Sequence, residues 1–200
     1  ANGANFVQMG KYPLGGSFKL EEEFFKESYL PAYTQFDTSC PGCLVFKVEP
    51  EKPQPIFIDL DLEVKSKTAY PTTKHYAAFT EDVLKILKYD ADVIITNRPT
   101  VTEKKTKKKD CLRHGAHVYI LGRFSLQQSK ELRKNVLKNK IVKKHFGEYM
   151  LNTPEDVYDE ALADRRNGLL MIGARKPNVS YNAHTITYGN SWTVENGWQR

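Results

Sequence analysis

The sequence predicts an α/β (α+β) fold in which a mostly antiparallel sheet is flanked by helices. Short apolar runs rich in β-forming residues recur along the chain, and segments with helical periodicity lie between them. No internal repeat is visible. With 200 residues, the chain is long enough to bury one substantial core. We expect a single domain over residues 1–200, with a loosely held lead at 1–20, a helix and strand unit at 21–55 and the main core at 56–190.

The expected strands are apolar runs bounded by turn residues. They cover residues 44–48, 56–62, 93–95, 117–121 and 169–172, with a further edge strand at 185–188. Because of the order of the elements, we expect the strands at 44–48 and 56–62 to form an antiparallel pair. The lysine-rich segment at 104–109 is expected to span a hairpin.

The expected helices have capping residues at their starts and an apolar stripe on one face. A short helix at 21–29 stops near Pro31. Thr80 caps a second helix that continues to residue 87, and Ser125 begins a third. In the third helix Leu132, Val136 and Leu137 form the buried stripe, and lysines cover the other face.

Composition excludes several classes of protein. The hydrophobic fraction is 40% and the charged fraction 27%, as in globular domains, and no apolar run is long enough to span a membrane. The N-terminal residues lack the features of a signal peptide, and the three cysteines are an odd number. We expect an intracellular, reducing location. The chain begins without Met, which suggests a domain excised from a longer protein.

The positive charge is concentrated in two segments. The net charge is +6, and residues 130–144 contain seven lysines and arginines against Glu131 alone. Five more lysines lie in residues 104–109. Clustered positive charge favours partners that carry phosphate groups. The alternative is a solvated helix face and an exposed lysine loop.

Asp59 and Asp61 lie two residues apart in the apolar run at 56–62. In a strand this spacing places both carboxylates on the same face, where they repel each other. A divalent cation between them would offset the repulsion, and carboxylate oxygens favour Mg²⁺ or Mn²⁺. The alternative is a solvent-facing strand, in which Phe57 would share the exposed face. We interpret the pair as half of a metal site.

Two further segments contain candidate residues. In the segment from Arg113 to residue 120, Gly115 would allow close approach of a ligand and His117 opens a strand, where it can donate a hydrogen bond to phosphate. A structural histidine is the alternative. Asp159 precedes the run at 169–172, which is followed by Arg175 and Lys176. Taken alone, Asp159 is typical of a solvated helix, and the two cations are typical of many loops.

Together, these segments resemble the archaeo-eukaryotic primase (AEP) superfamily, in particular the primase domains of primase-helicases in poxviruses and other large DNA viruses. The resemblance covers residues 56–188. It implies an AEP-type fold with an RRM-like sheet, metal binding by Asp59, Asp61 and Asp159, and phosphate contacts from His117 and Lys176. Several members have Arg where this chain has Leu170. Any nucleotide contact from that position is therefore absent, or is supplied by one of three other arginines, Arg165, Arg166 or Arg175.

The resemblance implies a DNA primase or primase-polymerase that builds short primers on single-stranded DNA by two-metal nucleotidyl transfer from NTP or dNTP. Arg113 and Arg175 are expected to help orient the triphosphate. Template contacts are expected from four lysines, Lys107, Lys134, Lys138 and Lys140. A helicase in the same longer chain and a cytoplasmic or viral replication site are also implied. Two alternatives remain: a non-catalytic nucleic-acid-binding module, and a metal-dependent nuclease or rolling-circle initiator with a nucleophilic tyrosine.

The cysteines allow a structural zinc site as a minor alternative. Cys40 and Cys43 have zinc-ligand spacing, and so do Cys111 and His114. Because the two half-sites are far apart in the sequence, only the fold could unite them. Reduced, unrelated thiols are the simpler interpretation.

Overall fold

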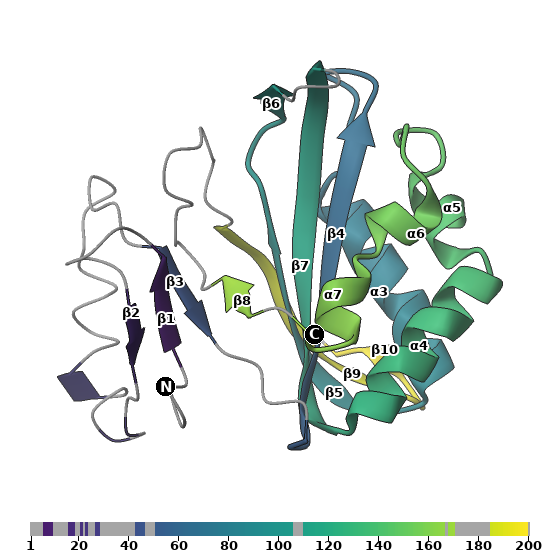
Figure 1. Ribbon diagram of the computed structural model, residues 1–200. Helices are drawn as coiled ribbons and strands as arrows, with labels where there is room; N and C mark the ends of the chain where they lie inside the picture. Colours follow the sequence, from purple (N-terminus) through teal and green to yellow (C-terminus); the bar gives the residue numbers. More distant parts are fainter. Residues whose placement is uncertain are drawn as a thin grey trace. The chain divides into compact units, whose positions relative to one another are not determined.

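The computed structural model describes residues 6–9, 16–18, 21, 23, 27–28, 43–46, 51–105, 110–166, 168–170 and 185–199. The chain divides into two compact units (Figure 1). The first comprises residues 1–48 and 167–183, and the second comprises residues 49–166 and 184–200. No helix in the described part of the chain is long and apolar enough to cross a membrane. The expectation that the whole chain acts as one domain stays a prediction.

The first unit contains a four-stranded sheet in the order β2-β1-β3-β8, in which all described pairs are antiparallel. Its strands are β1 Phe6–Met9, β2 Gly16–Phe18, β3 Cys43–Phe46 and β8 Leu169–Leu170. Strands β1 and β2 lie in the segment expected to be a loosely held lead, and that expectation stays a prediction. The expected helix at 21–29 and the end of the expected strand at 169–172 lie largely outside the described residues.

The predicted pairing of the strand at 44–48 with the strand at 56–62 is wrong. β3 pairs with β1 and β8 instead. The reason lies in residues 49–55, which contain three prolines and neither Gly nor Asn. Tight hairpins need residues that adopt positive φ, and proline cannot donate a ladder hydrogen bond.

The second unit contains a six-stranded sheet, ordered β10-β9-β5-β7-β4, with β6 paired to β7. Every described pairing is antiparallel, as predicted. The strands are β4 Gln54–Val64, β5 Ala91–Asn97, β6 Thr102–Lys105, β7 Asp110–Phe124, β9 Thr185–Thr193 and β10 Gly197–Trp198. The expected edge strand at 185–188 is the first part of β9. It pairs with β5 on one side, and β10 pairs only with Trp192 and Thr193, so among the described strands residues 185–188 lie at the edge of the sheet.

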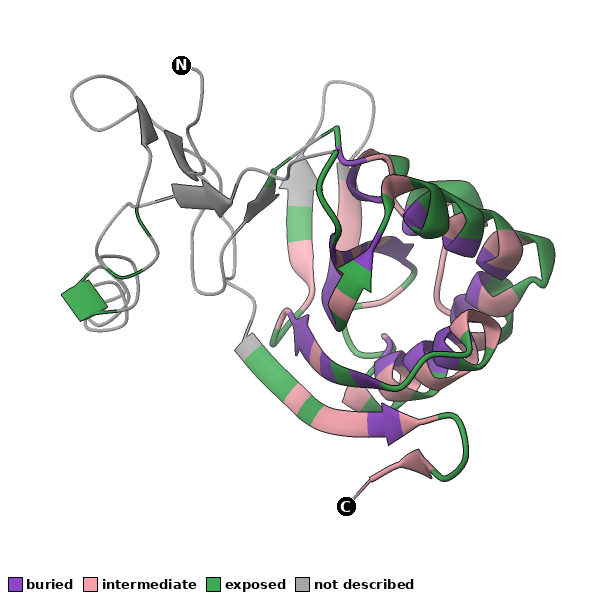
Figure 2. Cartoon of the chain, turned by 90° about the horizontal axis from the view of Figure 1, so that it is seen from below, coloured by how far each residue is buried: buried purple, intermediate pink, exposed green. Residues whose placement is uncertain are grey.

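Helices cover one face of this sheet (Figure 1). They are α3 Thr73–Leu87, α4 Leu126–Lys138, α5 Ile141–Phe146, α6 Pro154–Val157 and α7 Glu160–Ala163. Helix α4 begins as predicted, because the hydroxyl of Ser125 accepts from the amide of Gln128 and the side chain of Gln128 accepts from the amide of Ser125. Figure 2 shows that the helices are buried on one face and exposed on the other.

Helix α3 begins seven residues before the predicted cap at Thr80. The amide of Thr72 donates to Nδ1 of His75 at 3.1 Å, so a histidine takes the place of the usual Glu or Gln in a capping box. Thr80 lies inside the helix, where its hydroxyl donates to the carbonyl of Tyr76 at 2.7 Å.

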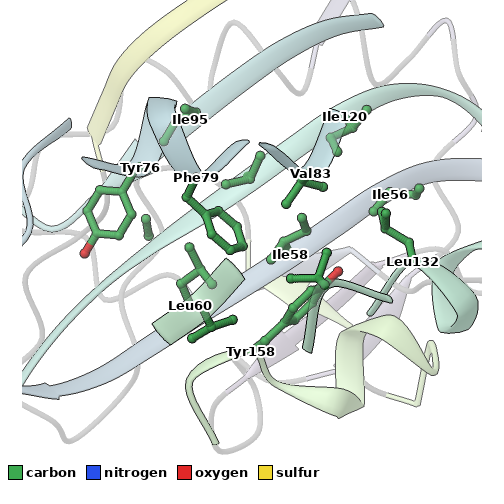
Figure 3. Packing of buried hydrophobic residues seen from close by; sticks show 14 of the residues in the cluster. Ile56, Ile58, Leu60, Tyr76, Phe79, Val83, Ile95, Ile120, Leu132 and Tyr158 are labelled. Carbon is green, nitrogen blue, oxygen red and sulfur yellow. The ribbon is translucent and has the colours of Figure 1, made fainter. Parts of the chain in front are cut away.

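The core lies between the sheet and the helices (Figure 3). Strand β4 contributes alternate residues, and α3, α4 and α5 contribute their inner faces. Burying each large apolar side chain stabilises the fold by about 1.5–3 kcal/mol. The core residues that pack the sheet against the helices include Ile56, Ile58, Leu60, Leu62, Phe79, Val83, Leu132, Val136, Val142 and Phe146.

Candidate active site

Asp59 and Asp61 lie on the face of β4 that is turned away from the helices. Ile58, Leu60 and Leu62 on the other face are fully buried, and the two aspartates alternate with them. Their side chains are 30% and 31% exposed. The shared face predicted from their spacing is therefore confirmed.

Strand β7 brings the predicted segment with Gly115 and His117 against these aspartates. His117 is opposite Asp59, and Gly115 is opposite Asp61. Nε2 of His117 lies 3.6 Å from Oδ1 of Asp59, which is longer than a hydrogen bond. A Cβ at Gly115 would overlap the carbonyl oxygen of Leu60. This glycine therefore lets β7 approach the backbone of β4, and a close approach of a ligand is not needed to explain it.

Asp61 is paired with an arginine. Nη1 of Arg113 lies 2.5 Å from Oδ2 of Asp61, and Nη2 of Arg113 lies 3.1 Å from Oε1 of Glu63. Nη2 of Arg98 lies 3.8 Å from the second oxygen of Asp61, Oδ1. That oxygen is buried and, within the described part of the chain, accepts no hydrogen bond. An acceptor of this kind suits a cation.

Asp159 comes from about a hundred residues downstream and lies next to Asp59. Tyr158 forms a bridge with Leu60, and the amide of Asp159 donates to the carbonyl of Asp59 at 3.0 Å. This register places Asp159 directly opposite Asp59. Oδ1 of Asp159 accepts from the amide of Ala161 at 2.8 Å, which caps α7.

The three carboxylates match the oxygen ligands that Mg²⁺ and Mn²⁺ prefer. Their side chains, however, are turned to other partners, Asp61 to Arg113 and Asp159 to the amide of Ala161. No three His, Cys, Asp or Glu side chains among the residues that the structure describes converge closely enough to hold a metal ion. The backbone contacts place Asp159 beside Asp59 on β4, and a role for the three carboxylates as metal ligands stays a prediction.

Three of the four lysines expected to contact the template lie elsewhere. Lys134 and Lys138 on α4 and Lys140 just before α5 are exposed. Helix α4 packs through Leu132 and Val136 into the core formed by the inner face of β4. These lysines therefore lie on the opposite side of the sheet from Asp59 and Asp61.

The remaining expected residues have mixed outcomes. Lys107, Arg175 and Lys176 lie outside the described residues. Arg165, one of the three alternatives for a contact at Leu170, is buried and donates to the carbonyls of Lys52 and Phe124 at 2.8 and 2.7 Å, which disfavours it for a nucleotide contact. Arg166 is exposed and pairs with Glu160.

Sequence reasoning missed Arg98 and Glu63, which both lie beside the aspartates. Arg98 directly follows β5. A basic residue at the end of a buried strand is the feature of the sequence that could have identified it as a site residue. His114 contacts the backbone of Arg98. Nε2 of His114 lies 3.0 Å from the carbonyl oxygen of Arg98, and Nδ1 lies 2.7 Å from the hydroxyl of Tyr76. Burial lowers the pKa of His114 to about 4. In the neutral tautomer that these contacts favour, Nε2 donates and Nδ1 accepts.

These contacts also bear on the zinc alternative. Both ring nitrogens of His114 are engaged, so this histidine is not available as a ligand. Cys111 is three residues away on the same strand, which places it on the opposite face. Cys40 lies outside the described residues, and nothing is described of the side chain of Cys43.

Comparison with known protein families shows which family the chain belongs to. Residues 9–188 match the C962R protein N-terminal AEP domain. None of the curated proteins compared with the chain matches it. The match includes the three aspartates, His117 and the strands that hold them, and it spans nearly the whole chain. The chain therefore belongs to the family of C962R-type N-terminal AEP domains, within the archaeo-eukaryotic primase superfamily.

Proposed function

We propose that this domain is a DNA primase or primase-polymerase that extends or initiates short primers on single-stranded DNA. The observation that supports it most is that the backbone of Asp159 is held opposite Asp59, on the strand that also carries Asp61, in a chain of the AEP family. Members of this superfamily typically use divalent metal ions. By resemblance to viral primase-helicases, we expect a helicase to act with it in a longer chain.

Asp59, Asp61 and Asp159 would hold two Mg²⁺ or Mn²⁺ ions. When bound, the ions would lower the pKa of the attacking 3′-hydroxyl and neutralise charge at the α-phosphate. Oδ2 of Asp61 would have to leave Arg113 to serve as a ligand, since the two now form an ion pair. Its other oxygen, Oδ1, is buried and accepts no hydrogen bond within the described residues, so it is available to coordinate a cation.

Arg113 and His117 would orient the triphosphate. Both are on β7 beside the carboxylates, and Glu63 holds the second guanidinium nitrogen of Arg113. When Asp61 turns to a cation, the first nitrogen becomes available for a phosphate oxygen, which guanidinium groups bind well. Arg175 and Lys176 are proposed as further phosphate contacts from their place in the sequence.

Lys107, Lys134, Lys138 and Lys140 are proposed to bind the phosphate backbone of the template. Because Lys134, Lys138 and Lys140 lie on the helical side of the sheet, they would contact a part of the strand away from the reacting nucleotide. Such contacts carry no sequence information and depend on salt.

A primer-synthesis assay on single-stranded DNA with labelled nucleotides and Mg²⁺ or Mn²⁺ tests the proposal. The variant with Asp59→Asn and Asp61→Asn keeps the size of both side chains and should lose incorporation while DNA binding persists. Glu195→Gln, in the exposed turn between β9 and β10, is the matched control. Incorporation by the double variant at the wild-type rate would show that the assignment is wrong.

The ion pair between Asp61 and Arg113 favours one second candidate, a nucleic-acid-binding module without turnover. In such a module Arg113 would replace the cation permanently. The same assay separates the two functions, because the module binds single-stranded DNA but incorporates no nucleotide at any Mn²⁺ concentration.

A further inference from the structure

The segment that carries Asp159 leaves a helix just before reaching β4. Helices α6 and α7 are separated only by Tyr158 and Asp159. In an uninterrupted helix the amide of Asp159 would donate to the carbonyl of Glu155, four residues earlier. It donates instead to the carbonyl of Asp59 on β4. The break in the helix is therefore what places Asp159 opposite Asp59.

Arg133 on α4 supplies the hydrogen bonds that this break removes. Its Nη2 donates to the carbonyl of Glu155 at 3.0 Å, which is the acceptor that Asp159 gives up. Its Nε donates to the carbonyl of Tyr158 at 2.9 Å. The planar guanidinium spans both carbonyls, which the single ammonium of a lysine does less well.

The aromatic ring of Tyr158 completes the contact. It is fully buried, and the guanidinium carbon of Arg133 lies 5.8 Å from the ring centroid. The carbonyl of Tyr158 is partly buried at its bond to Arg133, whereas the bond to the carbonyl of Glu155 is exposed to solvent. Loss of Arg133 would leave the carbonyl of Tyr158 without its donor, which is costly, and would favour resumption of the helix through residues 158 and 159. A resumed helix would withdraw the amide of Asp159 from Asp59.

We propose that Arg133 is a positioning residue for Asp159. It belongs to the basic run at 130–144 in the sequence, but its role differs from that of the exposed lysines around it. The consequence for metal binding rests on the proposed function of Asp159 as a ligand. The consequence for the backbone of Asp159 does not, so the two can be tested separately.

The first test measures hydrogen exchange of the Asp159 amide in the full 200-residue chain. Arg133→Met should raise its exchange rate by about tenfold or more, while amides in β7 keep their rates. Arg133→Lys should give an intermediate rate. Lys134→Met removes an exposed charge from the next position on α4 and should leave the rate unchanged.

The second test measures Mn²⁺ affinity without nucleotide or DNA. Arg133→Met should weaken binding by about tenfold, as for other residues that hold metal ligands in place. Combining it with Asp159→Asn should add little to the effect of Asp159→Asn alone, because both changes remove the same ligand. A residue that merely stabilised the fold would give additive effects.

The outcomes separate the two proposals. Unchanged exchange at Asp159 in folded Arg133→Met would overturn the positioning role, and so would additive effects on Mn²⁺ affinity. If the wild-type protein binds no Mn²⁺ but Arg133→Met exposes the Asp159 amide, Arg133 holds the segment and the proposed metal site is wrong.

Discussion

The amide of Asp159 donates a hydrogen bond to the carbonyl of Asp59, although a hundred residues separate them in the sequence. This contact and the bridge between Leu60 and Tyr158 attach the third candidate carboxylate to the edge of β4. The position of Asp159 therefore depends on these backbone contacts, together with the hydrogen bond that its side chain accepts from the amide of Ala161. It also depends on the close pairing of β4 with β7, which holds the other side of β4.

Gly115→Ala should disturb that pairing. The added Cβ would overlap the carbonyl oxygen of Leu60, and the backbone must shift to relieve the overlap. We expect a loss of about 1–3 kcal/mol in the free energy of unfolding, measured by urea denaturation. Gly189→Ala on β9 is the control, since the nearest atom to its Cβ would be 4.0 Å away. Equal stabilities of the two variants would contradict the prediction.

His114 should make stability depend on pH. Its folded-state pKa is lowered by burial to about 4 from an ordinary value of 6.5. Between these values the unfolded state binds the proton and the folded state does not, so stability falls as the pH falls from about 6.5 to about 4. The expected loss is about 3 kcal/mol.

Urea denaturation between pH 4 and 7 checks this prediction. His114→Gln can still accept from Tyr76 and donate to the carbonyl of Arg98, but it does not titrate. The variant should therefore show a flatter pH dependence than the wild-type protein. Parallel curves would assign the acid sensitivity to other groups.

Arg113→Met should separate metal binding from nucleotide binding. The variant removes the guanidinium group that is paired with the carboxylate of Asp61. We therefore expect Mn²⁺ affinity to increase by about tenfold, or about 1.4 kcal/mol. The KM for nucleotide should rise, because a phosphate contact is lost. Arg123→Met, an exposed arginine on the same strand, should change neither quantity. Weaker Mn²⁺ binding by Arg113→Met would mean that the ion pair helps to shape the metal site.

Features with a local cause were predictable from the sequence. The shared face of Asp59 and Asp61 follows from strand alternation, and the start of α4 follows from the capping box at Ser125. The early start of α3 was missed because a histidine replaces the usual acid or amide of the box.

Features that depend on side-chain direction or on long-range pairing were not predictable from local patterns. The pattern of residues does not show that Arg133 and Arg165 turn inward to backbone carbonyls while Lys134 stays exposed. The meeting of Asp159 with Asp59 was expected only through resemblance to a family. Periodicity contains no information on which segment pairs with the edge of β4.

Removing the charge of Lys134, Lys138 and Lys140 by substitution with Gln should weaken binding to single-stranded DNA. These lysines are exposed, and none forms an ion pair with a carboxylate of the described residues, so their charge is available to phosphate groups. If all three contact phosphates, the slope of log affinity against log salt should decrease by about 2 in magnitude.

The control variant replaces Lys65, Lys74 and Lys88 with Gln. These lysines are also exposed, and Lys88, like Lys140, has positive φ. Because the sheet separates Lys134, Lys138 and Lys140 from Asp59, incorporation at saturating template should stay near the wild-type rate. An unchanged salt slope would show that this face is simply solvated.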